Sequence, residues 1–323
     1  MLKKLLILSF LTLLTLSTIL AQDKATDLEK AKEMQAAKDQ KEGWTKTGSF
    51  GLGFDILSLI NPRPGQGDNL LRFSGALGYS ANLLRGKTIW NNKFGWILGL
   101  QKVGSDPLTK SADAFIVTSQ YGRQIGESGK WYGGFLADFQ SQVLPTYGKN
   151  FFSETATGLT KLPFTGGLFA PANLKFAPGI IYKPDAHWTM LYSPVGVKAV
   201  IVTNDLLKSA GTFFPVDATN PTKSIDFQLG SELRIDYVNK FLNDKVIYQS
   251  TLDLYSNYLR NPQNVDIEWF NSLDFVIAKN IAVTIKSDWF YDDDVKVLRS
   301  SNGTSGPDVF IRNFVGLKYA TTF

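Results

Sequence analysis

An alternation of apolar residues with polar or small ones runs through this chain from about residue 47 to its end. In the first such segment Phe50, Leu52 and Phe54 alternate with Gly51 and Gly53. A period of two is that of a β-strand with one apolar and one polar face, because successive side chains point to opposite faces. The sequence therefore predicts an all-β chain.

Twelve segments carry this pattern, and sequence reasoning places their boundaries to within about two to four residues. They span residues 47–57, 69–83, 87–102, 112–125, 130–144, 167–183, 186–203, 226–239, 244–258, 263–277, 280–292 and 308–323. The alternation is loose in 112–125. In 186–203 its parity shifts near Pro194 and Gly196, which indicates a bulge or a bend.

Alternation alone fits a soluble β-sandwich as well as a membrane barrel, but strand length and loop length favour the barrel. Many segments run 12–16 residues, long enough for a tilted strand to cross a bilayer. Connections after even-numbered segments are short, whereas most of the others are long, notably 145–166, 204–225 and 293–307, with 260–264 as a short exception. This asymmetry is typical of outer-membrane barrels. We expect an up-and-down antiparallel transmembrane β-barrel of about 12 strands, embedded in the lipid bilayer of the outer membrane, with both termini periplasmic.

The last segment ends the chain on an aromatic residue. Val315, Leu317, Tyr319 and the final Phe323 share one parity, a pattern that matches the signal read by the outer-membrane insertion machinery. The alternative is an ordinary edge strand, but an open edge this apolar would invite aggregation in a soluble protein. In lipid every backbone polar group must be paired, so a spanning sheet closes on itself.

The N-terminus has the features of a secretory signal peptide over residues 1–21. A basic start precedes an apolar stretch that ends at Ala21, and a membrane anchor is the alternative, although the stretch is short for a span. Residues 22–46 form a charged periplasmic leader, either flexible or a short helix that plugs the barrel or docks a periplasmic partner. Residues 47–323 form the barrel.

Composition excludes several chemistries. The chain has no cysteine and one histidine, His187, so disulfides, thiolate sites and multi-histidine metal sites are excluded. A net charge of +5 without a dense Lys/Arg run gives no reason to expect a nucleic-acid partner. His187 falls near a predicted periplasmic turn, where nothing marks a catalytic partner. We expect no cofactor and no catalytic residue.

Several stretches resemble one family. The run Gly95–Lys102 is similar to the third strand of a family of Bacteroidota outer-membrane proteins that is known only as a domain of unknown function, DUF3078. Other stretches that carry the resemblance are 169–172, 192–194, 257–265 and 291–294. The resemblance extends from about residue 48 to the end and departs from the family's pattern near Ser58–Asp68. It implies an outer-membrane barrel and brings no activity with it.

The predicted inward parity carries charges of both signs. The basic residues are Arg72, Lys93, Lys175, Arg234, Lys286, Arg312 and Lys318. The acidic ones are Asp138, Glu232, Asp236, Asp253, Glu268, Asp274 and Asp288. This balance predicts ion pairs across a narrow or partly closed lumen, and a charge-lined open pore is the rival interpretation.

The densest acidic cluster is Asp292, Asp293 and Asp294, at the predicted outer end of a strand. Carboxylates of this kind can bind Ca²⁺. The spacing matches no calcium-loop motif, however, so a solvated loop is the simpler interpretation.

The function expected from these features is a channel for small solutes. The alternative is a structural or accessory barrel that binds other envelope proteins, for instance in outer-membrane assembly or secretion. A lipase-type enzyme comes third. The long loops 145–166 and 204–225 are where a plug or a partner surface would lie.

Overall fold

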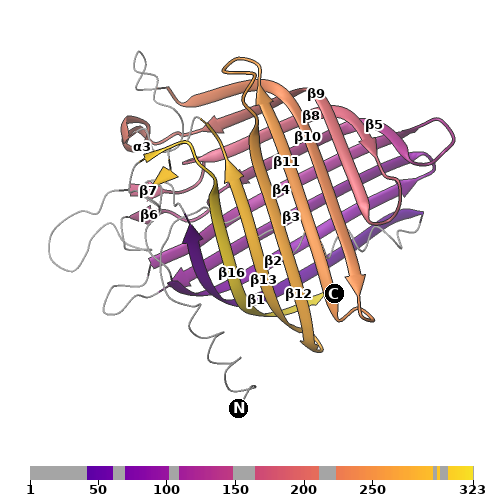
Figure 1. Cartoon of the computed structure of the whole chain (residues 1–323), viewed down its shortest axis with the longest axis horizontal. Coiled ribbons are helices and arrows are strands. Elements are labelled where there is room, and N and C mark those ends of the chain that lie inside the picture. The colour runs from indigo at the N-terminus through magenta and orange to yellow at the C-terminus, as the bar shows by residue number, and fades with distance from the viewer. Residues whose placement is uncertain are drawn as a thin grey trace.

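The computed structural model describes residues 42–60, 70–101, 109–147, 164–210, 223–293, 297–298 and 305–322. Twelve long antiparallel strands in this part of the chain close into one barrel. In Figure 1 the strands of the near wall, such as β11 and β12, run across those of the far wall, such as β3 and β4.

Each predicted segment corresponds to one strand of the barrel. The strands are β1 (Gly43–Ile60), β2 (Leu70–Arg85), β3 (Thr88–Gln101), β4 (Thr109–Ile125), β5 (Trp131–Ser141), β8 (Ala172–Tyr182), β9 (Trp188–Ile201), β10 (Ile225–Phe241), β11 (Val246–Asn257), β12 (Asp266–Ala278), β13 (Ile281–Tyr291) and β16 (Phe310–Thr322). The predicted fold class is therefore confirmed.

Short elements lie in the connections between barrel strands. They are β6 (Thr146–Tyr147), β7 (Phe164–Gly166), the helix α3 (Asp205–Ala210), β14 (Val297–Leu298) and β15 (Ser305–Gly306). No helix in the described part of the chain is long and apolar enough to cross a membrane.

The barrel closes where the first strand pairs with the last. β1 and β16 are in register from Ser49 opposite Thr322 to Ile60 opposite Ile311, so the sheet has no open edge. β1 begins at Gly43, four residues before the start predicted for the barrel. A carboxylate oxygen of Glu42 accepts a hydrogen bond from the backbone N–H of Gly86 at 2.9 Å, which ties the start of β1 to the turn between β2 and β3.

The connections differ between the two ends of the barrel as predicted. At one end two residues join β2 to β3, since Arg85 pairs with Thr88, and two join β12 to β13, since Ala278 pairs with Ile281. Gly86 and Asn280 take positive φ in these turns, at 53° and 63°, a conformation that glycine and asparagine tolerate. The long connections all lie at the other end.

Two bulges account for the segments where alternation was irregular. Gly196 pairs with Gly230 but Ser193 pairs with Glu232, so β9 carries an extra residue near Pro194, as the parity shift predicted. Gly99 pairs with Ala112 and Leu100 with Lys110, so Ser111 is extra in β4. A bulge shifts the parity of everything beyond it.

The outer surface of the barrel is apolar. Phe73, Phe227 and Leu317 are about half or more exposed, at 62%, 51% and 47%, and they alternate with buried or half-buried neighbours. At the short-turn end Trp131 stacks on Tyr182 at 4.2 Å and Trp188 lies 4.4 Å from Tyr237. Exposed apolar side chains in a continuous band, with aromatic residues at its rim, suit lipid and not water. This surface makes the chain a barrel of the outer-membrane type.

The C-terminal strand contributes to that surface. Val315, Leu317 and Tyr319 are all exposed on the outer face. Phe323 lies outside the described residues. Recognition of this C-terminal pattern, Val315, Leu317, Tyr319 and Phe323, by the insertion machinery stays a prediction.

Candidate functional site

Most charged residues of the barrel strands stand on the faces opposite to the exposed apolar ones, so these point into the lumen. Most are almost fully buried there: Arg72, Glu232, Arg234, Asp253, Asp274, Asp288 and Arg312. Asp236 is buried as well. The others predicted to face the lumen are half-buried: Lys93, Asp138, Lys175, Glu268, Lys286 and Lys318. Side chains that are this well covered fill much of the lumen at the level of these residues.

Lys175 joins strands that are not neighbours in the sheet. Its Nζ on β8 lies 2.9 Å from Oε1 of Glu232 on β10 and 2.5 Å from Oδ2 of Asp253 on β11. The ammonium group therefore reaches past β9 along the inside of the barrel. One cation is shared by two buried carboxylates.

Arg234 makes a second connection of this kind. Its Nη1 lies 3.7 Å from Oδ2 of Asp138 on β5, three strands away, and its Nε donates to Asp236 at 3.0 Å. Thr118 donates to the same Asp138 at 2.5 Å. We call Asp138, Lys175, Glu232, Arg234 and Asp253 the lumen bridge, because these five residues link β5 and β8 to β10 and β11 across the interior.

A second group of ion pairs lies on the neighbouring wall. Nη2 of Arg312 lies 2.8 Å from Oδ2 of Asp288, and Nζ of Lys318 lies 3.4 Å from Oδ2 of Asp274. The guanidinium of Arg312 lies 5.2 Å from the ring centroid of Phe290 and equally far from that of Phe314. The lumen beside β13 and β16 is therefore filled by aromatic rings and cations together.

The charges are segregated around the lumen. The inward positions of three adjacent strands, β10, β11 and β12, form what we call the acidic wall. Its acidic residues are Asp226, Glu232, Asp236, Asp253, Asp266, Glu268 and Asp274. Arg234 and, at the exposed rim, Lys240 are its basic residues. The flanking strands carry mainly cations at inward positions: Lys175, Lys198, Lys286, Arg312 and Lys318.

Lys183, in the turn after β8, also points toward the lumen side. The pKa of its ammonium group is lowered to about 8, because burial and, to a smaller extent, nearby Lys93 lower it while Asp236 raises it. The predicted segment 167–183 ends at this residue, but sequence reasoning did not include it among the lumen charges.

The predicted acidic cluster forms in part. Carboxylate oxygens of Asp292 and Asp293 lie within 4.8 Å of one another and of Asp266, and all three residues are half-buried. The amide of Asn264 donates to Asp293. Asp294 lies outside the described residues. Asp266 comes from the start of β12, so only the pairing of β12 with β13 could have revealed it.

His187 lies at the short-turn end of the barrel, where its hydrogen-bond contacts hold a turn. Its Nδ1 lies 3.0 Å from the carbonyl oxygen of Val238, and its backbone N–H donates to Asp185 at 2.7 Å. Both contacts hold the turn between β8 and β9.

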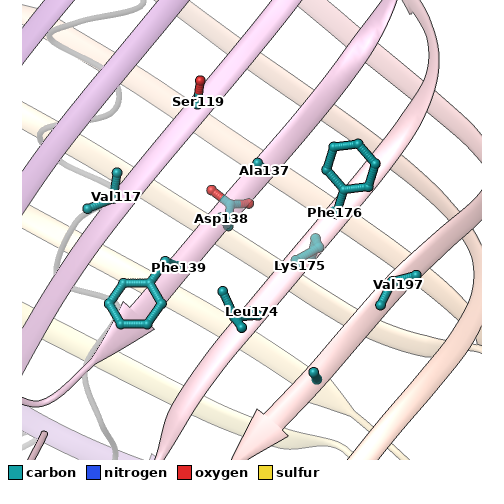
Figure 2. Close-up of a pocket in the computed structure, with 10 residues that line it drawn as sticks. Val117, Ser119, Ala137, Asp138, Phe139, Leu174, Lys175, Phe176 and Val197 are labelled. Atoms are coloured by element: carbon teal, nitrogen blue, oxygen red, sulfur yellow. The ribbon is translucent and has the colours of Figure 1, made fainter. Parts of the chain in front are cut away.

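The outside of the barrel has a hollow of about 400 Å³ over β4, β5, β8 and β9. Figure 2 shows Ala137 at its centre, between the larger side chains of Phe139 and Phe176. Apart from Ser119, Asp138 and Lys175, its lining consists of outward-facing apolar residues, so it belongs to the surface that contacts lipid.

Comparisons with solved structures find membrane barrels at low similarity. The translocator domain of the autotransporter NalP from Neisseria meningitidis has 8% identity and a TM-score of 0.38, over 91% of this chain and 94% of that one. The NanC porin has 10% identity and a TM-score of 0.39, over 83% and 98%. The COG4313 outer membrane channel from Pseudomonas putida F1 has 10% identity and a TM-score of 0.38, over 87% and 97%. None of these likenesses assigns a function.

The sequence itself has one family match. No curated protein matches it. Residues 61–147, which include β2 to β6, match the family described as "Protein of unknown function (DUF3078)", so the resemblance predicted from the sequence is confirmed over that stretch.

Proposed function

We propose that this chain is an outer-membrane channel for small hydrophilic solutes, without catalytic chemistry. The short-turn end and both termini would face the periplasm, as in other barrels with this loop asymmetry. The proposal rests on the contrast between an apolar outer surface and a lumen lined by charged side chains.

The charged lining is the observation that carries the proposal. A barrel that only has to stand closed could be filled with apolar side chains, since replacing a buried ion pair by hydrophobic residues is often neutral or stabilising. Here the inward positions of β10–β12 alone carry seven acidic residues. Polar groups in that number favour contact with water and polar solutes.

The lumen bridge limits the size of the solute. Lys175 and Arg234 each contact a strand that is three positions away around the barrel. Their side chains therefore occupy space that a large solute would need. Inorganic ions and small organic molecules fit this passage best.

Burial favours a second candidate, an accessory barrel that binds envelope proteins. Glu232 and Arg312 are only 1% and 2% exposed, which is what a closed lumen would show. In that case function would reside at the long-loop end, for example around α3, which packs near β7 in the loop between β9 and β10.

Conductance in planar bilayers separates the two candidates. The full chain is compared with a chain that lacks residues 23–41, a deletion that leaves Gly43 and the whole of β1 in place. Steady conductance of the full chain supports the channel. Current only after the deletion makes the leader a plug, and silence of both chains would contradict the channel and favour the accessory role.

A further inference from the structure

Three inward-facing residues of the acidic wall lie together at the lumen bridge. Glu232 on β10 pairs directly with Tyr255 on β11, and Asp253 is two residues before Tyr255 on the same face. Their exposed fractions are 1%, 1% and 5% in that order. They form a small cluster with two carboxylates and one phenol hydroxyl.

Each of these side chains has an oxygen that makes no hydrogen bond. The atoms are Oε2 of Glu232, Oδ1 of Asp253 and the hydroxyl of Tyr255, and all three are buried. Buried polar atoms are normally paired, because an unpaired one loses its interaction with water without compensation. Three such atoms on adjacent residues indicate a position that a further group is meant to occupy.

The same two carboxylates already bind an ammonium group. Lys175 contacts Oε1 of Glu232 at 2.9 Å and Oδ2 of Asp253 at 2.5 Å. The unpaired oxygens are the other one of each carboxylate. Of the four carboxylate oxygens of Glu232 and Asp253, two therefore contact an ammonium group. The two unpaired oxygens have the same chemistry as these.

The surroundings favour a donor or a cation over an anion. Other buried side-chain atoms of the lumen without a partner are also oxygens: those of Ser80, Asn82, Asn91, Gln101, Gln249 and Ser272. Among the described residues no buried side-chain nitrogen is without a partner. Nζ of Lys198 lies 3.8 Å from the ring centroid of Tyr255, so the cluster already holds a second ammonium group beside that of Lys175. The unused oxygens are acceptors for a further cation.

We infer that Glu232, Asp253 and Tyr255 form a binding site for a small monovalent cation, either an alkali metal ion or a primary ammonium group, at the lumen bridge. Oxygen atoms are the ligands that hard cations take, and an ammonium group makes charge-assisted hydrogen bonds to carboxylates. This inference rests on the proposed channel function and adds the class of solute. It makes the barrel cation-selective although its predicted lumen charges are balanced.

The test measures ion selectivity of the full-length chain in planar bilayers. Reversal potentials under a KCl gradient are compared for the wild type, Glu232→Gln, Asp253→Asn, Tyr255→Phe and the control Glu127→Gln. Glu127 is exposed in the short turn between β4 and β5. Heat-modifiable migration on gels shows which variants fold.

We expect the wild type to prefer K⁺ to Cl⁻. Glu232→Gln and Asp253→Asn should each lower the permeability ratio by about tenfold, which corresponds to about 1.4 kcal/mol, and Glu127→Gln should leave it unchanged. Tyr255→Phe keeps every ion pair, so it carries the test if the carboxylate variants fail to fold. Tyr255→Phe should lower the ratio by about threefold, the effect of one neutral hydrogen bond.

The outcomes separate the two proposals. A conducting wild type that shows no cation preference, or a preference that none of the three variants changes, would overturn the cation site and leave the channel standing. A silent wild type would overturn both. Bi-ionic potentials between KCl and methylammonium chloride identify the source of the cation, because the better-bound one permeates in preference.

Discussion

Replacing Arg312 by methionine should destabilise the barrel by about 3–5 kcal/mol, the usual cost of removing one partner of a buried ion pair. Arg312 and Asp288 are 2% and 3% exposed. Nε and Nη2 of Arg312 donate to the same Oδ2 of Asp288, at 3.1 and 2.8 Å. Methionine fills a similar volume but leaves the carboxylate buried without these two donors.

The magnitude follows from what remains after the substitution. The aromatic rings of Phe290 and Phe314 flank the guanidinium and cannot replace its two hydrogen bonds to the carboxylate of Asp288. Removing both charges avoids this penalty, so Arg312→Met combined with Asp288→Leu should be close to neutral. The double-mutant cycle should therefore show a coupling energy of several kcal/mol, which is outside the range expected for independent sites.

Urea unfolding from lipid vesicles, followed by tryptophan fluorescence, measures the free energy of unfolding. The matched control is Lys240→Met. Nζ of Lys240 lies 3.4 Å from Asp244 in an exposed pair at the rim, where a loss of about 0–1 kcal/mol is expected.

A loss below about 1 kcal/mol for Arg312→Met, equal to that of the exposed control, would refute this reasoning. It would mean that water solvates Asp288 as soon as its partner is removed. The lumen would then be open at this level, and the argument that side chains fill it would be wrong.

Three further perturbations test the outer face, the backbone and the turn. Phe176→Arg places a charge on the lipid face and should lower the free energy of unfolding by about 2–4 kcal/mol if the residue lies near the bilayer midplane. Phe176→Leu should lower it far less. Equal effects of the two variants on unfolding from vesicles would contradict a lipid-facing position. Gly230→Ala would bring a methyl group to 2.0 Å from a strand carbonyl oxygen and should abolish the heat-modifiable folded form, whereas Gly75→Ala, with nothing within 4 Å, should retain it. Burial holds the pKa of Lys183 at about 8, below its ordinary value of 10.5. The unfolded chain therefore binds more protons between these values, and the free energy of unfolding should rise with pH from 8 to 10.5, a rise that Lys183→Met should remove.

Strand positions could be predicted because the pattern is local. A strand with lipid on one side and a polar lumen on the other must alternate, so each residue reports its own face. Even the irregularity near Pro194 was visible, since the extra residue of a bulge reverses the parity that follows it.

Contacts between distant strands could not be predicted in the same way. Parity places Lys175, Glu232 and Asp253 in the lumen, but the reach of the lysine past β9 depends on the curvature of the closed sheet. Tyr255 was missed for a related reason. Its importance comes from its position opposite Glu232. The register between two strands cannot be predicted from the sequence of either strand alone.

Parity also fails where a loop covers the outer face. Asp113 stands on the outward parity of β4 and yet is 3% exposed. It accepts hydrogen bonds from Lys110 at 2.8 Å and from the backbone N–H of Leu144 at 2.8 Å, because the chain after β5 folds over this position. A carboxylate that alternation assigns to lipid is thereby removed from it.

The arrangement of charges, and not their sum, decides what a lumen of this kind can select. The predicted inward charges balance, which excludes a selectivity ring of one sign. Ion pairing leaves part of the carboxylates unused, because a carboxylate has two oxygens and Lys175 takes only one from each of Glu232 and Asp253. The unused acceptors then lie on β10 and β11 at the lumen bridge. A lumen whose predicted charges balance can therefore present a negative surface to a passing solute at this level.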